Sequence, residues 1–208
     1  MTVRSDDAQM ASLDVSRETN DRLTALVALL VKWNAAVNLV SKDTLSQVWQ
    51  RHILDSAQIF KLGSGAKVWA DLGSGGGFPG LVIAILAAEK APLMQVVLVE
   101  SDHRKAAFLA QASQSLGVHT KIIVDRIEKI EALNVDVVSA RALAPLPLLC
   151  SFAARHLAPN GVAIFLKGRN FHTELASAQA GWNFSLESHA SLTDPSAFVL
   201  VLKEIVHV

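Results

Sequence analysis

The stretch DLGSGGGFPG, residues 71–80, decides the fold of this chain. It lies between a short apolar segment, 68–70, and an apolar run, 81–88. Its glycines allow positive φ and a close approach of a ligand to the backbone, while Pro79 has the φ that the first turn of a helix needs. The stretch therefore predicts a ligand-binding loop that connects a buried strand to a helix.

One interpretation of this loop is a dinucleotide site. Gly75, Gly77 and Gly80 satisfy the pattern G-x-G-x-x-G. Glu100 follows a second apolar segment, 96–99, at the place where an acid can accept hydrogen bonds from ribose hydroxyls. By themselves, these residues would suit NAD as the cofactor.

Asp71 favours a different cofactor. Together with Gly73, Gly75 and Gly77 it forms the D-x-G-x-G-x-G pattern of S-adenosylmethionine enzymes. A carboxylate here would repel a pyrophosphate, but it can orient a loop around an amino acid that bears a sulfonium. The alternative is a plain glycine-rich turn capped by Asp71, which the separate presence of Glu100 makes less attractive.

The bulk composition indicates a compact soluble protein. The 208 residues carry 19 basic and 19 acidic side chains, so any contact with nucleic acid must come from a local patch. The most apolar candidate for a membrane span, residues 23–40, is interrupted by polar side chains, and the amino terminus lacks a secretory signal. A single cysteine, Cys150, predicts no disulfides and no metal cluster, and it favours a cytoplasmic location.

The first part of the chain reads as helical. Apolar residues recur at helical spacing over 23–37. Thr44 and Gln47 form a capping box that predicts the start of a second helix. We therefore expect residues 1–62 to form a helical extension packed on the catalytic domain.

The remainder, residues 63–208, alternates between strands and helices. Apolar segments that predict parallel strands occur at 68–70, 96–99, 121–124, 135–139 and 162–166. Residues 182–192 and 198–205 flank an Asp-Pro-Ser turn, which predicts an antiparallel pair. The fold expected is α/β: a doubly wound, mostly parallel, seven-stranded and Rossmann-like sheet, as in class I methyltransferases, that binds S-adenosylmethionine.

Charged side chains stand at the carboxyl ends of the predicted strands, where open α/β sheets bind ligands. They are Asp71, Glu100, the segment 125–128, Arg141 and Lys167. His52 and Asp55 share one face of the predicted second helix at spacing i, i+3. The alternatives are that Arg141 and Lys167 are solvated loop residues and that His52 lies on an exposed helix face.

A set of motifs carries a family resemblance. The motifs are Trp33-Asn34, Asn38-Leu39-Val40-Ser41, RHILDS from Arg51, DLGSGGGFPG, VESDHRKAAFL from Val99, Arg126-x-Glu128, SARAL from Ser139 and LKG from Leu166. Together, over roughly residues 20 to 169, they resemble the RsmG (GidB) family, bacterial enzymes that use S-adenosylmethionine to methylate N7 of a single guanine in 16S ribosomal RNA.

The resemblance implies a cofactor site lined by Gly73, Phe78, Ile127, Glu128 and Arg141. The glycine pattern and the second strand had already assigned Asp71, Gly75, Gly77 and Glu100 to the same site. The candidate catalytic residues are Arg141, Lys167, His52 and Asp55. The first two are expected to hold a phosphate or the guanine O6 edge, and His52 to act by position.

The resemblance also implies 16S ribosomal RNA or the small ribosomal subunit as partner. We further expect no metal, no membrane and a monomeric state. No general base is expected, because guanine N7 attacks with a lone pair that carries no proton, and alignment and desolvation then supply the rate. The alternatives are an NAD-dependent oxidoreductase and a noncatalytic ribosome-binding module that retains the fold.

Overall fold

A seven-stranded sheet organises residues 13–208, the part of the chain that this computed structural model describes. Its strands are β1 (Val68–Leu72), β2 (Gln95–Val99), β3 (Thr120–Ile123), β4 (Val135–Arg141), β5 (Leu157–Lys167), β6 (Trp182–Ala190) and β7 (Phe198–His207). Their order is β3-β2-β1-β4-β5-β7-β6. The first five pair in parallel, and β7 pairs antiparallel with both β5 and β6. The predicted doubly wound, mostly parallel sheet is confirmed.

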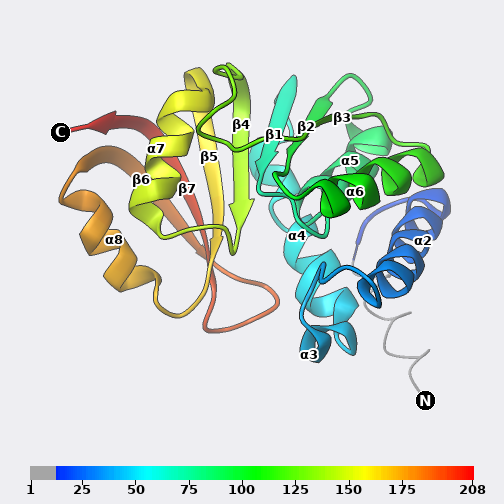
Figure 1. The fold of residues 1–208 in the computed structure, drawn as a ribbon. Helices are drawn as coiled ribbons and strands as arrows, with labels where there is room; N and C mark the ends of the chain where they lie inside the picture. The colour runs from blue at the N-terminus through cyan, green and yellow to red at the C-terminus, as the bar shows by residue number, and fades with distance from the viewer. Residues whose placement is uncertain (1–12) are drawn as a thin grey trace.

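Helices cover both faces of this sheet (Figure 1). The longer ones are α2 (Arg17–Asn34), α5 (Gly80–Lys90), α6 (His103–Leu116), α7 (Leu146–His156) and α8 (Phe171–Gln179). Four short segments follow α2: α3 (Lys42–Leu45), the π-helix η1 (Trp49–Leu54), α4 (Asp55–Ala57) and the 3₁₀-helix η2 (Phe60–Gly63). Across residues 13–208, no helix combines the length and the apolar character that a membrane crossing requires.

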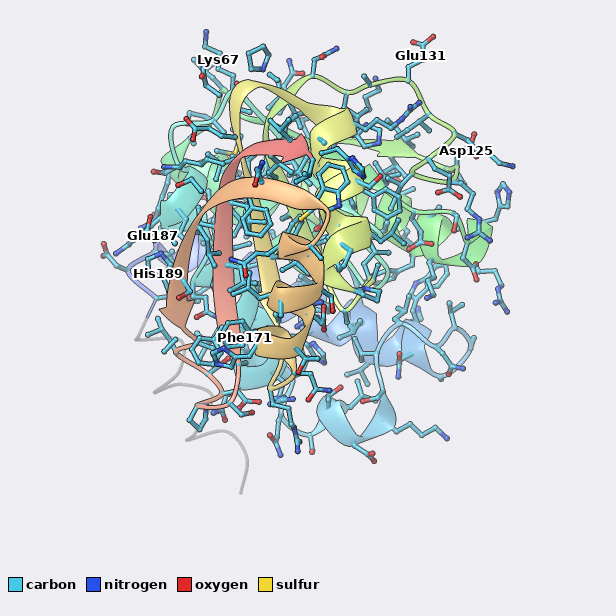
Figure 2. The ribbon with its side chains drawn as sticks, turned by 90° about the vertical axis from the view of Figure 1, so that its left-hand side faces the viewer. Lys67, Asp125, Glu131, Phe171, Glu187 and His189 are labelled. Atoms are coloured by element: carbon cyan, nitrogen blue, oxygen red, sulfur yellow. The ribbon has the colours of Figure 1, made fainter. Side chains whose placement is uncertain are left out.

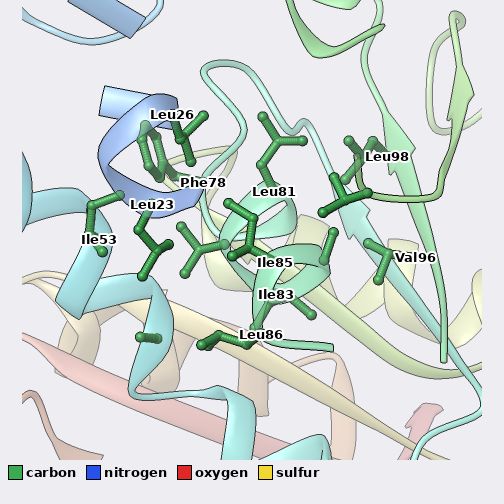
Figure 3. Packing of buried hydrophobic residues seen from close by; sticks show 14 of the residues in the cluster. Leu23, Leu26, Ile53, Phe78, Leu81, Ile83, Ile85, Leu86, Val96 and Leu98 are labelled. Carbon is green, nitrogen blue, oxygen red and sulfur yellow. The ribbon is translucent and has the colours of Figure 1, made fainter. Parts of the chain in front are cut away.

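The amino-terminal helices share one apolar core with α5, α6 and one face of the sheet. Every residue of α5 from Gly80 to Ala87 is buried, which requires cover on all sides of that helix. The sheet gives this cover on one side, and α2 and the short helices give it on the other. Figure 3 shows Leu23 and Leu26 of α2 and Ile53 of η1 on one side of α5, with Val96 and Leu98 of β2 on the other. The domain boundary at residue 62 stays a prediction.

The opposite face of the sheet packs against α7 and α8. Figure 2 looks from the edge of the sheet at β6 and shows Lys67, just before β1, at one end of the molecule. Phe171, shortly after β5, lies far below Lys67 in this view, and its ring packs on Phe198 with the centroids 4.2 Å apart. The carboxyl ends of the parallel strands therefore meet on the side of Phe171.

The expected capping box at Thr44 is wrong. Helix α3 follows Ser41, and the chain then passes through a π-helix instead of one continuous second helix. The Thr44 hydroxyl donates to the Ser41 carbonyl at 2.9 Å and contacts the ring of His52 at 2.8 Å. The Thr44 hydroxyl is therefore not free to accept a hydrogen bond from the Gln47 amide, as a capping box requires.

Candidate active site

The glycine-rich loop follows β1 directly and adopts backbone conformations that L-residues disfavour. Gly73, Gly75 and Gly77 have φ of +67°, +53° and +84°. The amides of Gly73 and Ser74 donate to the Val99 carbonyl at 2.8 and 3.0 Å, which fastens the loop to the end of β2. The backbone conformation of the loop thus requires glycine at these three positions, as the sequence predicts.

Asp71 lies beneath this loop, inside β1, and not at the strand tip where the sequence placed it. Its side chain is fully buried, and burial raises its pKa to about 6 against the opposing hydrogen bonds. One carboxylate oxygen accepts from the Gly80 amide at 3.1 Å, and the other accepts from the Ser139 hydroxyl at 2.9 Å. The carboxylate therefore anchors the start of α5 to the sheet and holds the loop from below.

Glu100 ties the loop to the segment after β2. Its Oε2 accepts from the Gly75 amide at 2.8 Å, and its Oε1 accepts from the Asp102 amide at 2.8 Å. The side chain is only 7% exposed. Because each carboxylate oxygen can accept more than one hydrogen bond, Glu100 retains acceptor capacity while it fixes the shape of the loop.

A cavity of about 700 Å³ opens beside the loop at the carboxyl ends of the strands. A cavity of this size is typical of sites for small molecules and cofactors. The loop contributes the backbone of Gly73, Gly75 and Gly76 to its wall. The predicted residues that also line it are Phe78, His52, Asp55, Arg141 and Lys167.

Arg141 is fixed at the end of β4 by three protein groups. Its Nη1 donates to the Arg51 carbonyl at 2.8 Å and to Asp55 Oδ2 at 3.3 Å. Its Nη2 donates to His52 Nδ1 at 2.8 Å. The guanidinium also lies over the ring of Phe78, 5.2 Å from the centroid. Burial lowers the pKa of Arg141, and the charge of Asp55 opposes part of this shift. The guanidinium therefore stays charged.

His52 is a buried neutral imidazole and not an incidental residue on an exposed face. It is 7% exposed, and its ring stacks on that of Phe78 with centroids 5.0 Å apart. Burial, and then the charges of Arg141 and Arg51, lower its pKa to about 3. At neutral pH the ring is therefore uncharged, and both of its nitrogens are already engaged in hydrogen bonds.

We expect His52 to lower the stability of the protein as the pH falls. The unfolded state binds a proton near the ordinary pKa of 6.5, whereas the folded state binds it only near 3. The free energy of unfolding then drops by up to about 1.4 kcal/mol per pH unit across that window. Chemical denaturation at pH 7 and pH 5 should show the stability advantage of the wild type over His52→Gln shrinking by about 2 kcal/mol. An advantage that is independent of pH would contradict this account.

Lys167 lies at the end of β5 with its side chain only 10% exposed. Its Nζ donates to the Ala144 carbonyl at 3.0 Å and pairs with Glu174 Oε2 at 2.5 Å. The same oxygen of Glu174 accepts from the Leu146 amide at 2.8 Å, at the start of α7. Lys167 is thus held in place on the cavity wall and does not extend freely into solvent.

The loop between β6 and β7, residues 191–197, closes the cavity on the far side. Thr193 Oγ1 donates to Asp55 Oδ1 at 2.9 Å, and Arg51 pairs with Asp194 at 2.6 Å. The Gln58 side chain accepts from the Leu192 amide at 2.9 Å. Figure 1 shows this loop reaching toward α4. The amino-terminal helices and the last hairpin together thus form part of the site.

Comparison with known proteins identifies the family. The family model for GidB, described as rRNA small subunit methyltransferase G, matches residues 19–197. A curated relative from Cereibacter sphaeroides, named Ribosomal RNA small subunit methyltransferase G, is 50% identical over 97% of this chain and 98% of its own length. One with the same name from Ruegeria pomeroyi is 48% identical over 95% of this chain and 97% of its own. The chain belongs to the GidB family.

Solved structures agree with GidB membership at the level of the fold. A SAM-dependent methyltransferase from Aquifex aeolicus superposes with a TM-score of 0.60 at 13% identity, over 84% of this chain and 97% of its own. A TehB-like SAM-dependent methyltransferase from Corynebacterium glutamicum gives a TM-score of 0.54 at 18% identity, over 77% and 96%. The class I methyltransferase fold expected from the strand pattern is therefore confirmed.

The structure brings together only part of the set of residues expected for a GidB site. Asp71, Gly77 and Glu100 lie outside the cavity wall: Asp71 beneath the loop, Gly77 against Leu81, and Glu100 on the amides of Gly75 and Asp102. Beyond β3, Ile127 is buried in the core between sheet and α7, and Glu128 is exposed. The cofactor roles of Ile127 and Glu128 stay predictions.

Sequence reasoning missed three polar residues that hold the residues of the candidate site in place. Thr44 contacts His52, Ser139 contacts Asp71, and Thr193 contacts Asp55. Ser139 stood within a motif that carried the resemblance, so its strand position could have drawn attention to it. No local pattern marks Thr193, because its partner is 138 positions away along the chain.

Proposed function

We propose that this chain transfers a methyl group from S-adenosylmethionine to N7 of a guanine in 16S ribosomal RNA. The observation that carries the proposal is the shared cavity, in which the backbone of the glycine loop faces the cluster of Phe78, His52 and Arg141. Membership of the GidB family supports the reaction class, because relatives that match nearly the whole chain are named as ribosomal RNA small subunit methyltransferases.

The loop fits a cofactor that makes close contact with backbone. Gly75 has φ of +53°, and a Cβ placed there would have only the Gly73 carbonyl within 4 Å, so open space faces the loop. Glu100 holds the Gly75 amide from one side and keeps acceptor capacity for hydroxyls. When bound, S-adenosylmethionine supplies an electrophilic methyl group on a sulfonium. Gly73, Gly75, Glu100 and Phe78 would hold it there.

The cluster on the cavity wall suits a reaction that needs no base. His52 has both ring nitrogens in hydrogen bonds, and its pKa of about 3 makes it a poor proton acceptor at pH 7. Guanine N7 needs none, because its lone pair attacks directly. Transfer of the methyl group would carry the positive charge from sulfur to N7 and would leave no proton for a residue of the cavity wall to accept. Arg141 would hold the guanine O6 edge or a phosphate.

Basic residues at the cavity suit an RNA substrate despite the balanced total charge. The three acids on the wall are each paired with a base: Asp55 with Arg141, Glu174 with Lys167 and Asp194 with Arg51. Two further bases on the wall, Lys105 and Arg169, have no acidic partner within residues 13–208. They would provide the local positive patch that phosphates need.

We expect S-adenosylhomocysteine, and not NAD, to bind the protein in isothermal titration. Glu100→Ala should weaken this binding by about 1–3 kcal/mol, because the Gly75 amide loses its charged acceptor. Glu18→Ala, on the exposed side of α2, is the matched control and should bind as the wild type does. Tighter binding of NAD than of S-adenosylhomocysteine would revive the oxidoreductase alternative, which none of the comparisons supports.

Methyl transfer itself is tested with purified small subunits and with naked 16S RNA. Incubation with tritiated S-adenosylmethionine should label the RNA, and chemical cleavage specific for 7-methylguanine should cut it at one site. Cofactor binding without transfer to either substrate would instead favour a noncatalytic ribosome-binding module.

A further inference from the structure

His52 lies within a chain of hydrogen bonds whose direction is fixed by chemistry. A guanidinium has only donors, so the contact from Arg141 Nη2 makes His52 Nδ1 the acceptor. The proton of the neutral ring must then be on Nε2, which donates to Thr44 Oγ1 at 2.8 Å. The hydroxyl of Thr44 in turn donates to the Ser41 carbonyl at 2.9 Å.

The other forms of His52 are incompatible with this arrangement. The tautomer with its proton on Nδ1 would point a donor at the donor of Arg141. A protonated ring would place a second positive charge 2.8 Å from the guanidinium nitrogen. The hydroxyl of Thr44 favours the one compatible form, because it offers an acceptor to Nε2.

The orientation of Arg141 depends on this form of the ring. Asp55 and the Arg51 carbonyl both engage Nη1, so His52 is the protein group that engages Nη2. Three of the five N–H donors of the guanidinium are used in this way, and two remain for a ligand. Loss of the contact at Nη2 would let the fork rotate about its contacts at Nη1 and redirect the remaining donors.

We propose that Thr44 is a positioning residue that acts through His52 to aim Arg141 into the cavity. The proposal rests on the methyl transfer proposed above, in which Arg141 contacts the substrate. Thr44 itself lines the cavity, is half-buried, and belongs to the short helix that sequence patterns misassign.

The test compares Thr44→Val with Thr44→Ser. Valine has the shape of threonine without its hydroxyl, whereas serine keeps the hydroxyl. Thr44→Val should lower kcat for methyl transfer about tenfold, with the affinity for S-adenosylhomocysteine unchanged, and Thr44→Ser should remain within about twofold of the wild type. Thr24→Val, which removes a hydroxyl bonded to the Asn20 carbonyl on α2, is the matched control.

Nitrogen NMR of the His52 ring gives a readout that does not depend on activity. The wild type, Thr44→Ser and Thr24→Val should show the proton on Nε2. In Thr44→Val the Nε2 proton would lose its acceptor, so the ring should leave its contact with Arg141 and, without that donor, show a mixture of tautomers. A wild-type proton on Nδ1, a Thr44→Val ring that keeps the wild-type tautomer, or an unchanged kcat would overturn the proposal. A wild type that methylates no guanine would overturn the proposed function instead, while the spectra would still decide whether Thr44 sets the tautomer of His52.

Discussion

Replacement of Arg141 with alanine is expected to reduce the rate of methyl transfer to guanine by about 100-fold. The side chain is 17% exposed and fixed by Arg51, Asp55 and His52, so its remaining donors are preorganised for the substrate. Arg141→Lys should recover little of the rate, because an ammonium cannot reproduce the planar fork. Single-turnover transfer of a tritiated methyl group measures the effect, with far-UV circular dichroism to confirm that the fold is retained.

Cys150→Ala is the control for this experiment. The thiol is fully buried in the core, and burial raises its pKa to about 11, so it has no step to perform. The substitution should cost some stability and leave turnover nearly intact. Turnover lost in Cys150→Ala and kept in Arg141→Ala would point to covalent chemistry at a base carbon and would overturn the mechanism.

Gly80→Ala is expected to lower the free energy of unfolding by roughly 3 kcal/mol or more, the largest effect on stability that we predict. A Cβ at Gly80 would contact the Leu98 side chain and would lie 2.7 Å from Asp71 Oδ2. Asp71 cannot move aside, because the Ser139 hydroxyl and the Gly80 amide hold it in a fully buried position. The strain therefore falls on the junction of β1 and α5, which shapes the glycine-rich loop.

The matched control is Gly65→Ala, where an added Cβ meets nothing within 4 Å. Urea denaturation of both variants measures the difference. Equal stability of the two would show that α5 does not pack against β1 as closely as described here.

The sequence was sufficient for the fold because the fold depends on local patterns. The glycines of 71–80 and the alternation of apolar strands with helices each follow from neighbouring residues, and they yielded the strand sequence and the antiparallel pair at the end. Asp71 was expected at the tip of the strand, but the strand runs one residue further. Because β1 continues to Leu72, the Asp71 carboxylate lies beneath the loop and not on the cavity wall.

The site could be predicted only in part because its contacts join distant segments. Arg141 and Lys167 were found from the ends of their strands, and both line the cavity. Their partners could not be found in that way. The contact between Arg141 and His52 spans 89 positions, and the hairpin loop reaches Asp55 across 138. The π-helix that turns His52 toward Thr44 also escapes patterns based on regular helical periodicity.

The most direct test of the proposed function is the mapping of 7-methylguanine in 16S ribosomal RNA from cells with and without this gene. One guanine should carry the modification in cells with the gene and lose it in cells without it. A plasmid copy of the wild type should restore the modification, and a copy carrying Arg141→Ala should not. A 7-methylguanine that persists without the gene, or that returns fully with Arg141→Ala, would contradict the account.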